Sequence, residues 1–130
     1  MKKMLIALLL FAGVAAYGQE KVGMENTAQK IEITADDFKV ITDEVRDGVR
    51  YVTAAPCGKV CSKQIDIEIK DGVIQKVVYT RGCDGNAKGI GALIKDMTVE
   101  EAIKRLDGIT CGKRDTSCPD QLARILKSLK

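Results

Sequence analysis

Apolar and polar residues alternate most regularly over residues 65–70, where isoleucine stands at every second position with a charged residue between. This alternation is typical of a strand with one face in the core and the other in water. Asp71-Gly72 follows as a two-residue hairpin signal, and residues 73–80 continue with apolar and β-branched side chains. The stretch therefore predicts a β-hairpin.

Two shorter stretches before this hairpin, 38–42 and 51–54, are also rich in apolar and β-branched residues, and Asp47-Gly48 lies between them as a turn signal. The first half of the chain thus predicts an antiparallel meander of three to four strands. Residues 19–37 carry only scattered apolar side chains, so we expect a flexible lead-in there.

In the second half the apolar residues recur every three or four positions, which predicts helices over 86–95, 98–108 and 119–130. Gly89 and Gly91 each cost about 1 kcal/mol relative to alanine inside a helix, so close packing is expected there. Strands followed by helices predict an α+β fold, with the three helices packed on one face of the sheet. The positions expected to be buried in these helices are Ala87, Ile90, Leu93, Ile94, Val99, Ala102, Ile103, Leu106, Leu122, Ile125, Leu126 and Leu129.

Residues 1–18 have the pattern of a secretory signal peptide. Lys2 and Lys3 precede an uncharged apolar run over 4–16, and small residues stand before a cleavage point ahead of Gln19. The run is shorter than the roughly 20 apolar residues that span a bilayer, so no membrane span is expected after cleavage. We expect an exported protein, periplasmic or secreted, and a cytoplasmic one if the segment is not processed.

Composition narrows the choice of function. The chain has 130 residues, which leaves one domain over residues 38–130, and removal of Lys2 and Lys3 leaves 19 basic and 18 acidic residues. A nearly neutral chain with few aromatic residues disfavours nucleic-acid binding. Histidine is absent, so cysteine and carboxylate are the expected metal ligands, and no serine has a histidine to activate it.

The five cysteines all stand in glycine-rich segments where one predicted element ends and another begins. Cys57 and Cys61 lie between the second and third strands, Cys83 between the last strand and the first helix, and Cys111 and Cys118 before the last helix. If these ends converge, four or five sulfur atoms meet, which suits zinc held by four thiolates. The spacings do not match the two-residue gaps of zinc ribbons.

Cys118 has a special position because Pro119 suits the first position of a helix. Cys118 is then expected at the helix cap, where free backbone N–H groups favour a negatively charged side chain. This makes Cys118 better placed than an average buried cysteine to bind a metal or to attack another sulfur, although the charges of Asp115 and Asp120 act against a thiolate.

Four separated blocks, at residues 61–62, 82–86, 108–112 and 116–122, resemble in order the TSCPD domain family, and the last begins Thr-Ser-Cys-Pro-Asp. The likeness covers about residues 50–130. That domain occurs alone in small bacterial proteins and at the C-terminal end of adenosylcobalamin-dependent ribonucleotide reductases. The resemblance implies that the metal ligands are the family cysteines, with Cys57 as an extra one. These family cysteines are Cys61, Cys83, Cys111 and Cys118.

The order of elements also resembles that of NifU-like iron–sulfur scaffold proteins, in which cysteines from three such loops hold a cluster or zinc. This likeness implies a NifU-like arrangement of the predicted fold. It would bring together Cys61, Cys83 and Cys118, with Asp84, Cys111 or Asp115 as a fourth ligand.

Three functions stay open on this basis. The TSCPD resemblance implies a zinc-binding accessory module whose partner is another protein, and it alone implies nucleotides or the deoxynucleotide synthesis of ribonucleoside-diphosphate reductase. Export favours a thiol–disulfide or disulfide-stapled protein, in which one of five thiols stays free. An iron–sulfur carrier is the third. Stand-alone catalysis is disfavoured, because the chain is too short for a radical-generating barrel.

Overall fold

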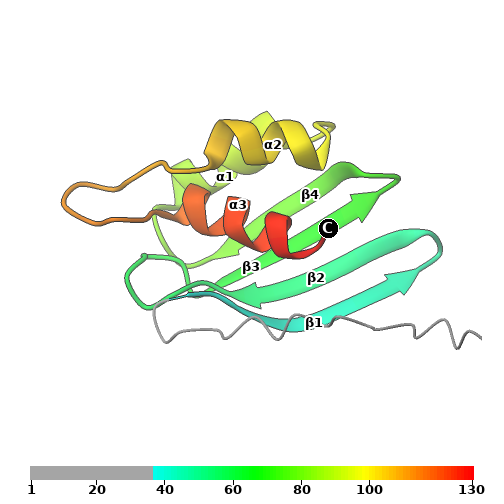
Figure 1. Ribbon diagram of the computed structural model, residues 1–130, viewed down its shortest axis with the longest axis horizontal. Helices are drawn as coiled ribbons and strands as arrows, with labels where there is room; N and C mark the ends of the chain where they lie inside the picture. The colour runs from blue at the N-terminus through cyan, green and yellow to red at the C-terminus, as the bar shows by residue number, and fades with distance from the viewer. Residues whose placement is uncertain (1–36) are drawn as a thin grey trace, which may run out of the picture. The chain divides into compact units, whose positions relative to one another are not determined.

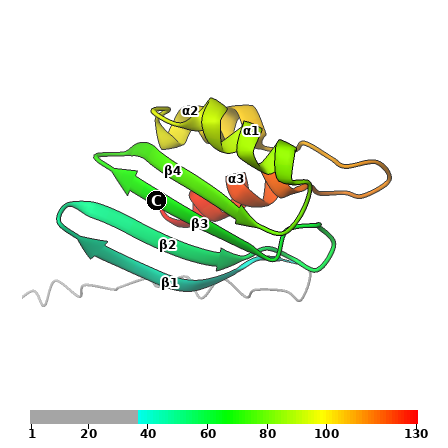
Figure 2. The same cartoon turned by 180° about the vertical axis from the view of Figure 1, so that it is seen from behind.

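A computed structural model describes residues 37–130, and Figures 1 and 2 show it from two sides. The described part consists of one antiparallel sheet in the order β1-β2-β3-β4, and three helices that lie on one face of it. The elements are β1 (Lys39–Arg46), β2 (Val49–Ala55), β3 (Gln64–Lys70), β4 (Val73–Thr80), α1 (Asp84–Ile94), α2 (Val99–Leu106) and α3 (Cys118–Ser128). The predicted α+β fold is confirmed.

Both hairpins of the sheet turn where the sequence predicts. Asp47 and Gly48 have φ angles of 52° and 76°, and Asp71 and Gly72 have φ angles of 50° and 73°. Two successive residues at positive φ define the turn whose twist matches that of the flanking strands, and Asp-Gly tolerates it best.

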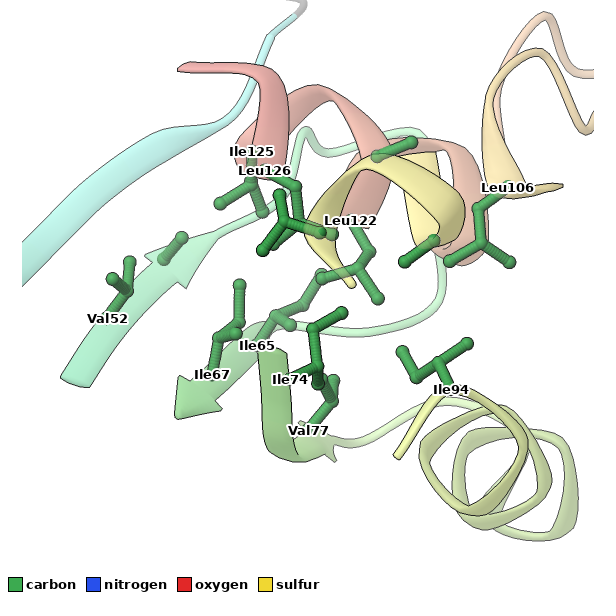
Figure 3. Close-up of a cluster of buried hydrophobic side chains, with 14 of the residues drawn as sticks. Val52, Ile65, Ile67, Ile74, Val77, Ile94, Leu106, Leu122, Ile125 and Leu126 are labelled. Carbon is green, nitrogen blue, oxygen red and sulfur yellow. The ribbon is translucent and has the colours of Figure 1, made fainter. Parts of the chain in front are cut away.

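The core lies between the sheet and the helices. The alternating isoleucines of β3 all face it, as predicted. On β4 the buried residues Ile74 and Val77 are three positions apart instead of two, because the pairing with β3 shifts by one residue between Glu68 and Ile69. Figure 3 shows both side chains pointing toward the helices. The shift is a β-bulge, which lets both residues point into the core.

Helices α2 and α3 cover the sheet with the apolar stripes that the sequence predicts. In α3, Leu122, Ile125 and Leu126 are fully buried above the sheet (Figure 3). In α2, Thr98 caps the first turn by accepting a hydrogen bond from the backbone N–H of Glu101 (3.2 Å). These local signals were sufficient to predict both helices, because each packs one continuous stripe of apolar side chains against the core.

Helix α1 is placed differently from the prediction. A Cβ atom on Gly91 would lie 2.7 Å from the carbonyl oxygen of Val77, so glycine is required there for α1 to approach β4, as expected. Gly89 meets nothing within 4 Å, so the expected close packing is wrong at that position. Leu93, predicted to be buried, is 75% exposed. It lies about 100° around the helix from Ile94, which faces the core.

Two predictions concern residues outside the described part: the signal peptide at 1–18 and, apart from Asp37, the lead-in at 19–37. Phe38 is buried against the core beside β1, at the predicted start of the domain. None of the helices within residues 37–130 has the length and apolar character needed to cross a membrane.

Candidate thiol site

Three connections meet at one end of the sheet: the β2–β3 loop, the β4–α1 junction and the α2–α3 loop (Figure 2). Together they surround a cavity of about 380 Å³. Four cysteines line it: Cys61, Cys83, Cys111 and Cys118. These are the family cysteines named from the sequence, and they come from all three connections.

Cys57 is placed apart from the other cysteines. It is buried and does not line the cavity, and its backbone N–H donates a hydrogen bond to Oε1 of Gln121 (3.0 Å). All five cysteines are free thiols. Across residues 37–130, no three side chains of histidine, cysteine, aspartate or glutamate are grouped so that they could hold a metal ion. The cysteines therefore share a cavity but not a coordination geometry.

Cys118 is the first residue of α3 and is half-buried, whereas Cys61, Cys83 and Cys111 are exposed. The cap of α3 is Ser117, one residue before the predicted position, and its Oγ accepts a hydrogen bond from the backbone N–H of Asp120 (3.2 Å). The sequence signal for this cap was a serine followed three residues later by an acidic residue. On the cavity side, Oγ of Ser62 donates a hydrogen bond to Sγ of Cys118 (3.2 Å).

Asp120 holds both ends of the α2–α3 loop through its side chain. Its buried carboxylate accepts hydrogen bonds from the backbone N–H of Gly108 (2.7 Å), the hydroxyl of Thr116 (2.6 Å) and Nε of Arg124 (2.9 Å). Burial raises the pKa of Asp120, but the hydrogen bonds and the charge of Arg124 outweigh it, so the pKa lies below its usual range. This role was not predicted, because the bond to Gly108 joins residues twelve positions apart and the nearer partners, Thr116 and Arg124, give no sign that the carboxylate is buried.

Gln121 and Ser117 extend the same network. The side-chain N–H of Gln121 donates to Oγ1 of Thr116 (3.0 Å), and the hydroxyl of Ser117 donates to the carbonyl oxygen of Ile109 (2.6 Å). Gln121 also holds the β2–β3 loop through Cys57. The polar residues of the Thr-Ser-Cys-Pro-Asp-Gln block thus connect the β2–β3 and α2–α3 loops to the start of α3. The cysteine of this block, Cys118, lines the cavity.

Arg114 approaches the thiols from the α2–α3 loop. Its Nη1 donates a hydrogen bond to Sγ of Cys61 (3.4 Å), and this contact, with the charges of the neighbouring cysteines, raises the pKa of Arg114. A tight turn connects Cys111 to Arg114 through a backbone hydrogen bond (3.1 Å), and an ion pair connects Asp115 to Lys59 of the β2–β3 loop (3.5 Å). Two loops that carry cavity cysteines are therefore linked by side-chain contacts.

Tyr79 reaches the cavity from β4. Its hydroxyl is buried and has no hydrogen-bond partner within residues 37–130. Burial, and secondarily the charge of Cys118, raises the pKa of Tyr79 well above its usual range. The hydroxyl therefore stays protonated and remains a hydrogen-bond donor. Nothing in the strand pattern distinguished this tyrosine from a core residue.

The β4–α1 junction places Cys83 by means of two residues at positive φ, Arg81 (63°) and Gly82 (97°). A Cβ on Gly82 would lie 3.5 Å from the backbone nitrogen of Ser62, so this junction runs close beside the β2–β3 loop. Cys83 occupies the cap position of α1 without making a side-chain cap hydrogen bond. Both α1 and α3 thus begin at the cavity, and their positive dipole ends favour negatively charged groups there.

Comparison with known proteins identifies a family. The sequence model of the TSCPD domain matches residues 17–130. No curated protein and no solved structure matches the chain, so the NifU-like layout stays a prediction. The match extends over most of the sequence and includes every residue of the thiol cavity. The chain belongs to the TSCPD domain family.

Proposed function

We propose that the chain is a zinc-binding accessory module, in which Cys61, Cys83, Cys111 and Cys118 hold the ion. The observation that carries this proposal is the single cavity lined by these cysteines from three separate connections. The metal would act structurally, tying the three connections to the end of the sheet. Free energy from zinc binding to thiolates, on the order of 10 kcal/mol, is ample for ordering loops of this length.

The chemistry of the donors fits a thiophilic ion. Thiolates favour zinc, copper(I) and iron–sulfur clusters over hard ions such as magnesium. Four thiolates around a divalent ion leave an excess of negative charge, which Arg81 and Arg114 and the two helix ends beside the cavity would balance. Binding at Cys61 would displace the guanidinium of Arg114 from its sulfur.

Three of the four sulfurs lie on exposed residues, so closure of the loops is compatible with the packing of the core. Cys61, Cys83 and Cys111 are exposed, and Gly112, at a φ of 62°, follows Cys111. The core itself is closed beneath them by Leu122 and Ile65. Loop closure would therefore require no change in the sheet or in α3.

The zinc proposal predicts about one zinc ion per chain after purification in reducing, chelator-free buffer, measured by inductively coupled plasma mass spectrometry. Substitution Cys118→Ser is expected to abolish that zinc, whereas the matched control Cys57→Ala, outside the cavity, keeps it. Intact mass after thiol alkylation is expected to show the four cavity thiols unreactive in the loaded protein and labelled after chelation. Loss of zinc from both variants alike, or from neither, contradicts the assignment.

An iron–sulfur cluster is the second candidate, favoured by the size of the cavity. A volume of about 380 Å³ exceeds what one coordinated ion fills. In the purification experiment this candidate is recognised by visible absorption and by iron with acid-labile sulfide. The thiol–disulfide alternative is recognised in the same alkylation experiment, since it gives two disulfides and one labelled thiol without reductant.

The accessory role includes a protein partner, by analogy with the ribonucleotide reductases that carry this domain at their C-terminal end. Membership of the TSCPD family supports this part of the proposal. Export is proposed separately from it: residues 1–18 are removed as a signal peptide, which predicts a mature chain that begins at Gln19. Mass spectrometry of the protein from its native compartment tests this, and an unprocessed chain places it in the cytoplasm.

A further inference from the structure

The mouth of the thiol cavity carries apolar side chains that the fold leaves uncovered. Leu93 is 75% and Ile109 41% exposed, and both line the cavity. Ile90 and Pro119 are half-buried beside them. Single exposed apolar residues are ordinary, but these four share one concave surface, which is typical of a site for another molecule.

The one basic residue in the cavity lining has no acidic counterpart there, and further basic residues lie on the loops that surround the mouth. Arg81 is part of the lining, Lys63 is the last residue of the β2–β3 loop and is bonded through its backbone to Thr80 at the end of β4, and Lys113 lies in the turn between Cys111 and Arg114. Within the described residues, none of these three cations forms an ion pair. The acidic side chains of this end are already paired, Asp84 with Lys88 (2.7 Å) and Asp115 with a lysine of the facing loop. The mouth therefore presents an excess of positive charge.

Helix α1 leaves its own backbone accessible on this side. Gly85 and Gly89 are four residues apart, hence on one face of the helix, and both line the cavity. A Cβ atom at either position would meet nothing within 4 Å. Another chain can thus come closer to this helix than side chains would normally allow.

We infer that the cavity mouth docks an acidic protein segment that inserts an apolar side chain between Leu93 and Ile109. Charge complementarity with the basic rim selects the acidic residues, and the apolar mouth selects the inserted side chain. A nucleic acid fits less well, because Tyr79 is the one aromatic residue in the lining and its hydroxyl is buried. The inference rests on the proposed accessory role and deepens it by giving the chemistry of the partner.

The test is a selection of random twelve-residue peptides, displayed on phage, against the full chain under reducing conditions. The expected result is enrichment of peptides in which aspartate or glutamate flanks leucine, isoleucine or phenylalanine. The best peptide, synthesised with a fluorescent label, is then measured by anisotropy. Leu93→Ser is expected to weaken its binding about tenfold or more, and the double variant Arg81→Glu, Lys113→Glu is expected to weaken it likewise.

Two controls lie outside the mouth. Val78 is 42% exposed on the face of the sheet away from the helices, and Lys70 lies at the far end of β3. Val78→Ser and Lys70→Glu should bind the peptide as the unaltered chain does. Circular dichroism of every variant verifies its folding, which excludes unfolding as the cause of weaker peptide binding.

Several results would overturn the inference: a selection that returns no binder, binders without acidic enrichment, or equal binding by Leu93→Ser. Tighter binding of a single-stranded oligonucleotide than of the peptide would assign the surface to nucleic acid instead. A dimer seen by light scattering and lost in Leu93→Ser would assign it to a second copy of the chain. Zinc measured on the same samples separates failure here from failure of the metal proposal.

Discussion

Helices α1 and α3 begin at the same cavity, each with a cysteine at its start, yet they are held in opposite ways. Helix α3 buries Leu122, Ile125 and Leu126 completely. In α1 the one fully packed side chain is Ile94, and the helix approaches the sheet through Gly91. The cavity wall formed by α3 is therefore packed into the core, whereas the wall formed by α1 contacts the sheet through few residues.

The difference separates the stability of the fold from its interaction surface. The start of α3 is fixed by hydrogen bonds of Ser117 and Asp120, which also hold the neighbouring loops. The exposed residues of α1 contribute little to the core and are free to contact a partner. Segments that bind other molecules are often drawn from the less stable parts of a fold. Substitutions in the two helices should therefore affect different properties.

The largest expected effect is in the core of α3. Leu126→Ala removes a fully buried side chain and is expected to lower the free energy of unfolding by about 3 kcal/mol. Leu93→Ala in α1 should change it by less than about 0.5 kcal/mol, because that side chain is exposed. Urea denaturation of the reduced, metal-free chain measures both. A comparable loss in the two variants would mean that α1 is packed as tightly as α3.

The next effect concerns the polar anchor of α3. Asp120→Ala leaves the N–H of Gly108 and the hydroxyl of Thr116 without their acceptor, which is expected to cost about 2 kcal/mol. Asp115→Ala, which removes an exposed ion pair of the same loop, should cost less than about 0.5 kcal/mol. The same denaturation experiment compares them, and equal losses would contradict the role given to Asp120.

Asp120 also predicts how stability depends on pH. Its pKa in the folded chain is lowered, so the folded state binds fewer protons than the unfolded state in the acid range. The stabilisation is present above the pKa of unfolded aspartate, about 3.9, and is lost as the pH falls through the lower folded value. Denaturation between about pH 5 and 2 should show a smaller loss in Asp120→Ala than in the unaltered chain.

The sequence predicted those parts of the fold that local patterns determine. The alternation in β3, the two Asp-Gly turns and the apolar stripes of α2 and α3 each depend on residues a few positions apart. The grouping of the cysteines was also predictable, because each stands in a connection between elements, and every second connection of an antiparallel meander lies at the same end of the sheet.

The remaining features depend on contacts between distant segments. The rotation of α1, which exposes Leu93, follows from the approach of Gly91 to the carbonyl of Val77, and periodicity alone cannot give it. The network of Asp120 and Gln121 joins residues from three segments. The sequence around Asp120 and Gln121 does not distinguish buried polar side chains from solvent-exposed ones, so their burial could not be predicted.

The smallest effects test the contact line of α1. Gly91→Ala would place a Cβ 2.7 Å from the carbonyl oxygen of Val77, so α1 must shift outward, with an expected loss of about 1.5 kcal/mol. Gly89→Ala meets open space and should stabilise the chain by up to about 1 kcal/mol, since alanine favours the helix. Denaturation midpoints that move in opposite directions support this placement of α1. If Gly91→Ala also stabilises the chain, α1 does not contact β4 at that position, and the cavity wall that it forms must lie elsewhere.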